Sequence, residues 1–297
     1  MKDFEEFKGR VVYGIGSYLP EEYAGATVSI KTETKNNGLE LTGLCVVKAG
    51  SVVSPIVYLE PFYQDYKNGV LMMDVLDEIA KLVVQANIEA FDPSNVEDFA
   101  KCRKRIIPCL INTGKNLDLL KKCPHKEVED LSVIYKILVD VENNSGFVTI
   151  DNKFLNAWEI SENELHAIAF RNAHETFECE SMQSVIDGYR AATGTNNVYP
   201  PCAADSCMNI ISNRSCTFGA AAVVDREFMS EVVARYGTDF FLLPSSIHEM
   251  LLITEGDVNT LRQMVREVND TCVYPKDILS YNVYRYDPYK EKIKIIL

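Results

Sequence analysis

Alternation of apolar and polar positions marks the first clear element of the chain, a β-hairpin over residues 28–42. Valine, isoleucine and threonine side chains alternate there with charged or small polar ones, which is typical of half-buried strands. The pair Asn37-Gly38 interrupts the alternation and suits the two positive φ angles of a type I′ turn. With these two residues as the loop, Thr34 faces Leu41 across the hairpin.

Apolar residues at three- and four-residue steps predict the main helices. The run over residues 72–86 predicts an amphipathic helix of about 15 residues. A capping box that begins at Ser161 predicts a second helix, which continues to about Phe177. Asp225 and Asp257 stand at the N-cap position of two further amphipathic runs near the C-terminus.

Short apolar runs between turn signals predict strands, many of them in adjacent pairs. Paired strands favour hairpins, and hairpins build antiparallel sheets. We therefore expect an α+β protein, with mainly antiparallel sheets flanked by amphipathic helices. The strands predicted after the first hairpin cover residues 52–59, 106–111, 132–141, 146–150, 208–211, 220–224, 240–243, 248–253, 282–286 and 292–296.

The chain has 297 residues, which is enough for one large domain or two smaller ones. No internal repeat and no low-complexity linker divides the sequence. We expect a single compact unit over residues 1–297, with two lobes, 1–150 and 151–297, as the alternative. The stretch 194–205, which contains two prolines and two asparagines, is predicted to be a loop.

The formal net charge of −13 narrows the classes of partner that this protein binds. Nucleic acid binding needs a positive footprint, and the one basic run, residues 101–105, is more simply the solvated flank of a strand. We expect no nucleic acid partner and, for the same electrostatic reason, no membrane partner. The N-terminal residues lack the apolar core of a signal peptide, and no membrane span is evident, so we expect a cytoplasmic protein.

Nine cysteines are scattered along the chain without a pattern that indicates disulfides. The group Cys202, Cys207 and Cys216 has gaps of four and eight residues and no neighbouring histidine, which does not suit tetrahedral zinc. The sequence also lacks a phosphate-binding glycine loop, a dinucleotide fingerprint and a metallohydrolase motif. We therefore predict no metal and no cofactor.

The string of residues 243–249 places two hydroxyls, an imidazole and a carboxylate close together. A hydroxyl nucleophile needs a base within hydrogen-bond reach and a group that orients this base. On an extended chain Ser246 and His248 share a face, whereas Glu249 points to the other. These three are the candidate catalytic residues, with Ser245 as the alternative nucleophile. The competing interpretation is a Pro-Ser-Ser turn whose serines bond backbone amides.

A second candidate site lies at Asn213 and Arg214, which are followed by the small residues 219–222. Small side chains let a ligand approach the backbone, and an arginine can hold a carboxylate or a phosphate. Together with Ser245, these two residues are the candidate ligand-binding residues. The alternative is a hairpin turn packed under a helix. We expect the two candidate groups to meet at strand ends of one C-terminal sheet.

Several stretches of the sequence also carry a family resemblance. They are Lys35-Asn36-Asn37-Gly38, Leu41-Thr42-Gly43-Leu44, Ser54-Pro55-Ile56-Val57-Tyr58-Leu59, Tyr66-Lys67-Asn68-Gly69, Ser212-Asn213-Arg214, Gly219-Ala220-Ala221, Leu243-Pro244-Ser245-Ser246-Ile247-His248-Glu249 and Met264-Val265-Arg266-Glu267-Val268-Asn269. With them the chain resembles, over about residues 28–286, a domain-of-unknown-function family of clostridial and other gut Firmicutes proteins. The Leu-Pro-Ser-Ser-Ile-His-Glu string is the most specific stretch, and residues 200–207 depart from the pattern. The resemblance implies no activity.

Three functional hypotheses follow from the sequence. The first is a binding or accessory protein that recognises a small polar ligand or a protein partner. The second is a hydrolase or transferase that uses Ser246, or Ser245, with His248 as its base. The third is an acidic inhibitor protein of a mobile element, because an acidic surface can mimic nucleic acid. A serine hydroxyl within reach of a base, in a concave site with amide donors, would distinguish the enzyme from the binding protein.

Overall fold

The computed structural model describes residues 3–49, 56–85, 94–141, 144–193 and 208–296. Helices and antiparallel strands are both abundant in it, so the predicted α+β class is confirmed. The predicted loop at 194–205 lies outside the described residues. By its contacts the chain divides into two units, Met1–Asn95 with Val139–Gly146, and Val96–Leu138 with Phe147–Leu297. This division falls near residue 95, whereas the alternative of two lobes had its boundary at 150.

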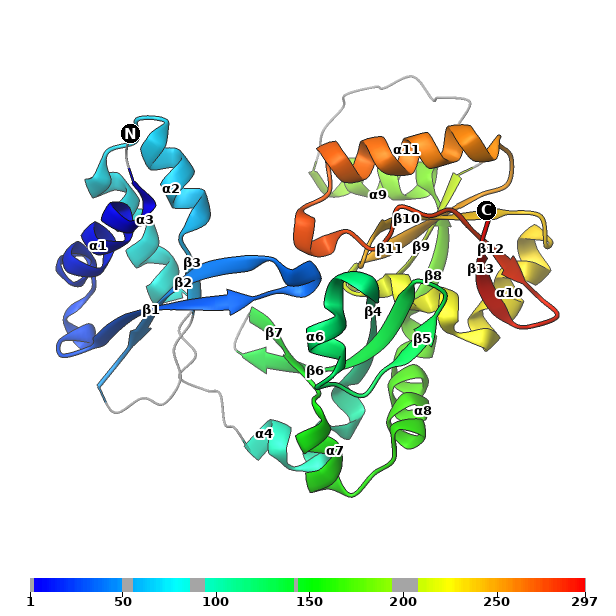
Figure 1. The fold of residues 1–297 in the computed structure, drawn as a ribbon, viewed down its shortest axis with the longest axis horizontal. Coiled ribbons are helices and arrows are strands. Elements are labelled where there is room, and N and C mark those ends of the chain that lie inside the picture. The colour runs from blue at the N-terminus through cyan, green and yellow to red at the C-terminus, as the bar shows by residue number, and fades with distance from the viewer. Residues whose placement is uncertain (1–2, 50–55, 86–93, 142–143, 194–207, 297) are drawn as a thin grey trace. The chain divides into compact units, whose positions relative to one another are not determined.

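The first unit combines a three-stranded antiparallel sheet with three helices (Figure 1). Its apolar side chains form one core, in which Phe7, Leu44, Leu59 and Ile79 are fully buried. The strands are β1 (Thr27–Thr34), β2 (Glu40–Val47) and β3 (Ile56–Tyr58), and the helices are α1 (Phe4–Gly14), α2 (Glu60–Lys67) and α3 (Met72–Gln85). The amphipathic helix predicted over 72–86 is thereby confirmed as α3.

The hairpin between β1 and β2 exists, but its predicted register is wrong by one residue. Thr34 pairs with Glu40 rather than with Leu41. The amide of Lys35 donates to the carbonyl of Leu39, so the loop contains three residues, and both Asn37 and Gly38 have positive φ. Asn37-Gly38 was therefore correct as the turn signal. Because Asn36 also belongs to the loop, every cross-strand pair is shifted by one residue from the prediction.

The second unit contains two sheets, except that residues 139–146 of the smaller sheet are grouped with the first unit. The smaller one has the order β4-β6-β5, with β7 paired to β6, and it lies beside several short helices. Its strands are β4 (Ile106–Asn112), β5 (Lys126–Val128), β6 (Leu131–Val141) and β7 (Asn144–Thr149). The helices of this part of the chain are α4 (Ser94–Glu97), α5 (Phe99–Cys102), α6 (Leu117–Leu120), α7 (Asn152–Trp158) and α8 (Glu162–Ala173).

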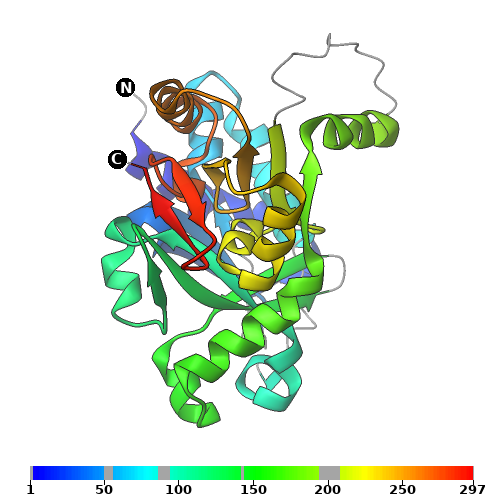
Figure 2. The ribbon, with the colours of Figure 1, turned by 90° about the vertical axis from the view of Figure 1, so that its right-hand side faces the viewer.

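The larger sheet is antiparallel throughout, with the order β13-β12-β10-β11-β9-β8. Apolar side chains of α11 pack on one face of it, and Figures 1 and 2 show α10 on the opposite side. The strands are β8 (Phe177–Ser181), β9 (Met208–Asn213), β10 (Phe241–Ser246), β11 (Glu249–Ile253), β12 (Tyr284–Asp287) and β13 (Lys292–Ile295). The helices are α9 (Met182–Thr193), α10 (Arg226–Tyr236) and α11 (Val258–Thr271).

The predicted N-caps are correct, because the side chains of Ser161, Asp225 and Asp257 each accept an amide of the following helix. Helix α8 nevertheless ends at Ala173 rather than near Phe177, and Phe177 begins strand β8. Short 3₁₀ helices complete the fold: η1 (Ile15–Ser17), η2 (Glu21–Tyr23), η3 (Asn36–Gly38), η4 (Arg103–Arg105), η5 (Gly114–Asn116), η6 (His174–Thr176), η8 (Gly219–Val224) and η9 (Pro275–Asp277).

Residues 220–224, predicted as a strand, belong to the 3₁₀ helix η8, so this prediction is wrong. The element is buried over Gly219 to Val223 and lies against β4, β9, β11 and β13. Its small side chains allow this approach. A Cβ atom on Gly219 would lie 2.5 Å from the backbone nitrogen of Asn213, closer than real Cβ contacts allow.

One carboxylate joins the two sheets of the second unit. Asp130, in the turn between β5 and β6, accepts hydrogen bonds from the Ser280 hydroxyl at 2.7 Å and the Asn282 amide at 3.0 Å. The hydroxyl of Tyr284, on β12, donates to its other oxygen. Burial and the neighbouring Asp130 raise the pKa of Tyr284, so this tyrosine stays a neutral donor.

Candidate functional site

The string of residues 243–249 forms the end of β10, a tight turn and the start of β11. Pro244 pairs with Met250 and Ser246 pairs with Glu249, so Ser245 is the extra residue of a β-bulge. The hydroxyl of Ser245 donates to Oε1 of Glu249 at 2.8 Å. The Glu249 carboxylate is therefore engaged within its own turn.

Ser246 has a backbone partner in this turn. Its Oγ accepts a hydrogen bond from the amide of His248 at 3.1 Å, which is the local serine–backbone bond typical of turns. Among the hydrogen bonds of the described residues, none joins the Ser245 or Ser246 hydroxyl to the imidazole of His248. The predicted catalytic residues thus lie in one turn, but neither serine hydroxyl bonds the imidazole of His248.

Both ring nitrogens of His248 face other groups. Nδ1 accepts the amide proton of Phe218 at 3.2 Å, and Nε2 lies 3.7 Å from Oδ1 of Asp277. Because Nδ1 is an acceptor here, the proton of the neutral ring is assigned to Nε2, on the side of Asp277. The ring is 34% exposed, and the Asp277 side chain is 18% exposed. His248 is thus fixed by an amide on one side and a carboxylate on the other.

Phe218 supplies that amide from an unusual backbone conformation. Its φ of 58° lies in the left-handed region, immediately before the buried Gly219. Its ring stacks on the His248 ring with centroids 5.5 Å apart and an interplanar angle of 23°. Phe147 meets the Phe218 ring edge-on at 4.8 Å, and Nζ of Lys136 lies 5.2 Å from its centroid. Three side chains from distant parts of the second unit, those of His248, Phe147 and Lys136, therefore meet at Phe218.

Asn213 holds the turn that leads to Phe218. Its amide nitrogen donates to the carbonyl of Thr217 at 2.8 Å, and its Oδ1 accepts the Thr217 amide at 3.0 Å and the Ser215 hydroxyl at 3.1 Å. All of these bonds lie within the turn. The adjacent Ser212 hydroxyl donates to the carbonyl of His248 at 2.9 Å, which ties the two predicted groups together through the backbone.

Arg214 points to a different partner. Its Nε donates to Oε1 of Glu178, on β8, at 2.8 Å, and its side chain is 70% exposed. Such a surface ion pair contributes little to stability. Asn213 thus holds the turn that leads to Phe218, the neighbour of His248. Arg214 instead pairs with Glu178 on β8, the edge strand of the sheet.

The sequence reasoning missed Phe218 and Asp277, which lie beside His248, and Lys136, which lies beside Phe218. No motif links them, because they lie up to about a hundred residues from His248 along the chain. The ammonium of Lys136 also donates to Oγ1 of Thr149 at 3.0 Å. The one local signal was the Pro-Lys-Asp sequence at 275–277, which forms the short turn that carries Asp277.

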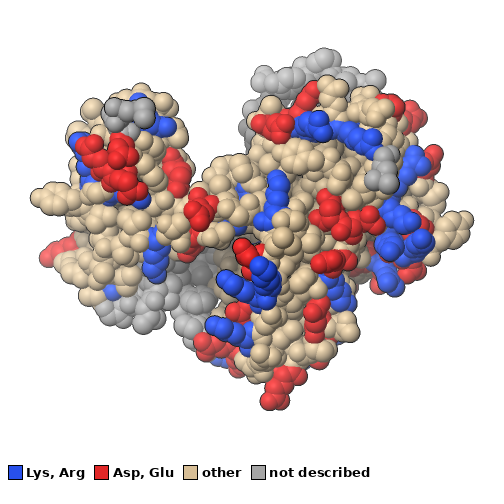
Figure 3. Space-filling model, in the orientation of Figure 1, with Lys and Arg blue, Asp and Glu red and all other residues tan. Residues whose placement is uncertain are grey.

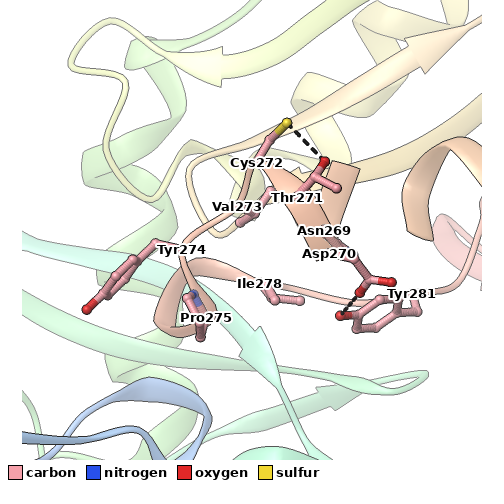
Figure 4. Close-up of a pocket in the computed structure, with 9 residues that line it drawn as sticks. All are labelled: Asn269, Asp270, Thr271, Cys272, Val273, Tyr274, Pro275, Ile278 and Tyr281. Atoms are coloured by element: carbon pink, nitrogen blue, oxygen red, sulfur yellow. Dashed lines mark hydrogen bonds between the residues drawn. The ribbon is translucent and has the colours of Figure 1, made fainter. Parts of the chain in front are cut away.

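Next to Asp277 the surface is hollowed at the C-terminal end of α11 (Figure 4). Figure 4 shows the Asp270 carboxylate directed at Tyr281, whose hydroxyl donates to it at 2.9 Å. The hollow has a volume of about 480 Å³ and is broadly open to solvent. We call it the α11 hollow, and its lining residues are Asn269, Asp270, Thr271, Cys272, Val273, Tyr274, Pro275, Ile278 and Tyr281.

Asn269 is the most buried polar residue of the α11 hollow, with 3% of its surface exposed. Its amide nitrogen donates to the carbonyl of Ser280 at 2.9 Å. Its Oδ1 is buried and has no hydrogen-bond partner in the structure. A buried acceptor without a donor costs free energy, and this oxygen is shielded from the solvent outside the chain.

Within the described part of the chain, no three histidine, cysteine, aspartate or glutamate side chains are grouped so that they could hold a metal ion. Cys216 is exposed in the 213–218 turn, while Cys202 and Cys207 lie outside the described residues. Figure 3 shows acidic and basic side chains interspersed on the face it presents, with Lys and Arg gathered over β12 and β13. No helix among the described residues is long and apolar enough to cross a membrane.

The comparisons with known proteins give a family but no activity. A model described as a family of unknown function, DUF5688, matches residues 4–288. No curated protein and no solved structure matches the chain. The resemblance to a family of unknown function is confirmed, while the range of organisms stays a prediction. Because the match covers nearly the whole chain, this protein belongs to the family DUF5688.

Proposed function

We propose that this protein is a binding protein that recognises a small polar ligand at the α11 hollow. The observation that carries the proposal is the hollow itself, whose lining includes the Asp270 carboxylate and the Tyr281 hydroxyl that donates to it. Few convergent polar groups beside aromatic and apolar side chains are typical of small-ligand sites. Tyr274, Tyr281 and Ile278 supply the aromatic and apolar part of this lining.

The surroundings of His248 favour binding over catalysis. A general base needs a free lone pair within reach of the proton that it removes. The Nδ1 lone pair of His248 already accepts the Phe218 amide, and Nε2 carries the proton that faces Asp277. In this arrangement His248 lies against the loop that carries Asp277. The same loop borders the α11 hollow through Pro275 and Ile278.

The hydrolase or transferase that uses Ser246 or Ser245 stays the alternative function. It needs a rearrangement in which His248 releases the Phe218 amide and turns Nδ1 toward a serine hydroxyl. Glu249 would then have to exchange its bond with Ser245 for one with the imidazole. In the same alternative Asn213 and Arg214 would bind an anionic part of the substrate.

The test is a thermal-shift screen of the full chain against a library of small polar compounds. Cys272 is exposed and lines the hollow, so Cys272→Trp fills the hollow without disturbing the core. Cys272→Ser is the matched control, because it keeps the hollow open at the same position. We expect a stabilising compound that acts on the wild type and on Cys272→Ser but not on Cys272→Trp.

The alternative function is tested in parallel. A hydrolase substrate screen compares the wild type with Ser246→Ala and Ser245→Ala. Turnover that is lost in either serine variant would favour the enzyme. In the thermal-shift screen, a compound that stabilises the wild type, Cys272→Ser and Cys272→Trp equally would bind away from the α11 hollow.

A further inference from the structure

Strand β1 forms an edge of the three-stranded sheet of the first unit, with β2 on its inner side (Figure 1). The backbone of Thr42, on β2, shows which way the groups of β1 face. The Thr42 carbonyl accepts the Leu59 amide at 2.9 Å, and the Thr42 amide donates to Oε1 of Glu60 at 2.6 Å, so both groups point away from β1. Opposite residues of an antiparallel pair exchange both of their hydrogen bonds or neither. Thr32, which pairs with Thr42, therefore directs its own amide and carbonyl to the open side of β1.

Ile30 and Thr34 face the same open side, because the direction of the hydrogen bonds alternates from residue to residue along a strand. The amides and carbonyls of Ile30, Thr32 and Thr34 form a row that no hydrogen bond of the described residues engages. Thr32 and Thr34 are exposed, and Ile30 is half-buried. Such a row of free donors and acceptors is a template on which another strand can pair.

Other edge strands of the described chain are covered or short. On β4 the carbonyl of Ile106 accepts the side-chain amide of Asn172 at 2.9 Å, and on β8 the carbonyl of Cys179 accepts the guanidinium of Arg235 at 3.3 Å. Strand β13 has four residues, and lysines are two of them. Strand β1 has eight residues, no proline and an unbroken register with β2. It therefore lacks the devices that usually prevent an edge from pairing.

The charges of β1 indicate which strand fits beside it. Lys31 and Glu33 lie on one face of the sheet, on either side of Thr32. When a second copy of β1 lies antiparallel with the two Thr32 residues opposite each other, Lys31 of each copy stands opposite Glu33 of the other. A pairing centred on Lys31 or on Glu33 would place like charges opposite each other, which is destabilising. The charges of β1 are thus complementary to those of a second copy in the register centred on Thr32.

We propose that two copies of this chain pair through β1, antiparallel and about a two-fold axis at Thr32. The pairing joins two three-stranded sheets into one continuous sheet. Thr32 bonds its counterpart and Ile30 bonds Thr34 of the other copy, so the whole free row gains partners. A two-fold interface uses the same surface on both subunits, which requires the self-complementarity that β1 has.

The Glu33 carboxylate can serve its own chain and the second copy together. Its Oε2 accepts hydrogen bonds from Nζ of Lys35 at 2.7 Å and from the Tyr58 hydroxyl at 3.1 Å. Oε1 is left for Lys31 of the second copy. The two Lys31–Glu33 pairs occupy non-hydrogen-bonded positions, where cross-strand side chains are closest. Because one strand edge buries little apolar surface, we expect a weak dimer, with a dissociation constant on the order of 10–100 μM.

The experiment is sedimentation velocity of the full chain, over concentrations from well below to well above this constant. The variants Lys31→Glu and Glu33→Lys each place like charges at both cross-strand pairs, so each should weaken association by about tenfold or more. An equimolar mixture of the two variants restores opposite charges at both pairs and should associate about as well as the wild type. Thermal melts verify that each variant is folded.

The variant Lys81→Glu is the matched control, because it makes the same change of net charge at an exposed position of α3. It should change the dissociation constant less than twofold. A wild type that stays monomeric at every concentration would overturn the proposal. So would a dimer that weakens equally in Lys31→Glu and Lys81→Glu, or a mixture of folded variants that fails to associate.

A second measurement does not depend on the variants. Hydrogen exchange of the wild type, followed residue by residue, should show the amides of Ile30, Thr32 and Thr34 becoming protected as concentration rises. The amides of Lys31 and Glu33, which face β2, should be protected equally at low and high concentration. A dimer in which Ile30, Thr32 and Thr34 exchange as fast as in the monomer would use another surface and would contradict the proposal.

Discussion

The backbone amide of Phe218 donates to Nδ1 of His248 at 3.2 Å while the Phe218 ring stacks on the same imidazole at 5.5 Å. One residue thus contacts the histidine in two ways, and it does so from a left-handed conformation that directs both its amide and its ring. The Asn213 turn on one side and the buried Gly219 on the other hold that conformation. His248 is consequently part of the scaffold beside the α11 hollow.

Replacing His248 by alanine should lower the free energy of unfolding by about 1–3 kcal/mol, because the amide of the buried Phe218 loses its acceptor. Chemical denaturation of the full chain measures this change. Ser246→Ala removes only a partly exposed turn bond and should cost about 1 kcal/mol or less. A His248→Ala chain as stable as the wild type would contradict the scaffold role.

Gly219→Ala should destabilise the protein by more than about 2 kcal/mol, because the new Cβ would press on the backbone of Asn213 and Ser212. Gly188→Ala is the matched control in helix α9, where nothing lies within 4 Å of the place that a Cβ atom would take and alanine is the better helix former. It should stabilise by up to about 1 kcal/mol. Thermal or denaturant melts compare the two variants, and similar stabilities would refute the close approach of η8 to β9.

Asp130→Ala should lower the free energy of unfolding by about 2–4 kcal/mol, since three donors lose one charged acceptor. Asp118→Ala removes an exposed carboxylate whose one ion pair, with Lys121, lies at the surface, and it should leave the melting curve unchanged. Hydrogen exchange should show that Asp130→Ala loosens the segment 280–284 first. Equal protection of this segment in both variants would mean that Asp130 does not hold the two sheets together.

His166 makes stability depend on pH. Its Nδ1 is hydrogen-bonded to the hydroxyl of Tyr135 at 2.9 Å, and burial lowers the pKa of the imidazole from 6.5 to about 4. The unfolded chain therefore binds more protons between pH 4 and 6.5, so stability rises with pH through this window and is lost as pH falls through it. The full shift corresponds to about 3 kcal/mol, which partial exposure of the ring reduces to about 1–2 kcal/mol.

Denaturant melts at pH 4.5 and 7.0 measure this dependence. The variant His166→Asn keeps an acceptor for the Tyr135 hydroxyl but cannot titrate, so its stability should change less between the two pH values. An NMR titration that places the imidazole pKa near 6.5 would contradict the burial argument.

Local sequence chemistry determined the helix starts and the sheet class of this protein. Ser161, Asp225 and Asp257 could be assigned as N-caps because a capping side chain reaches only its own first turn. The α3 helix followed from periodicity, and the antiparallel sheets followed from strands in adjacent pairs. The turn reading of residues 243–249, in which serines bond backbone amides, agrees with the Ser246 bond for the same local reason.

Tertiary structure alone decided the elements and contacts that depend on distant neighbours. Residues 220–224 are a short apolar run, which predicted a strand, yet they form a 3₁₀ helix because small side chains let this segment pack between β4 and the larger sheet. Phe177 became a strand residue through its pairing with Asn213. The partners of His248 are Phe218 and Asp277. The α11 hollow forms where the chain after α11 folds back along the end of this helix. The contacts of His248 join residues about 30 apart in sequence, so no local pattern encodes them. The α11 hollow is lined by the single segment 269–281, and only the way this segment folds back creates it.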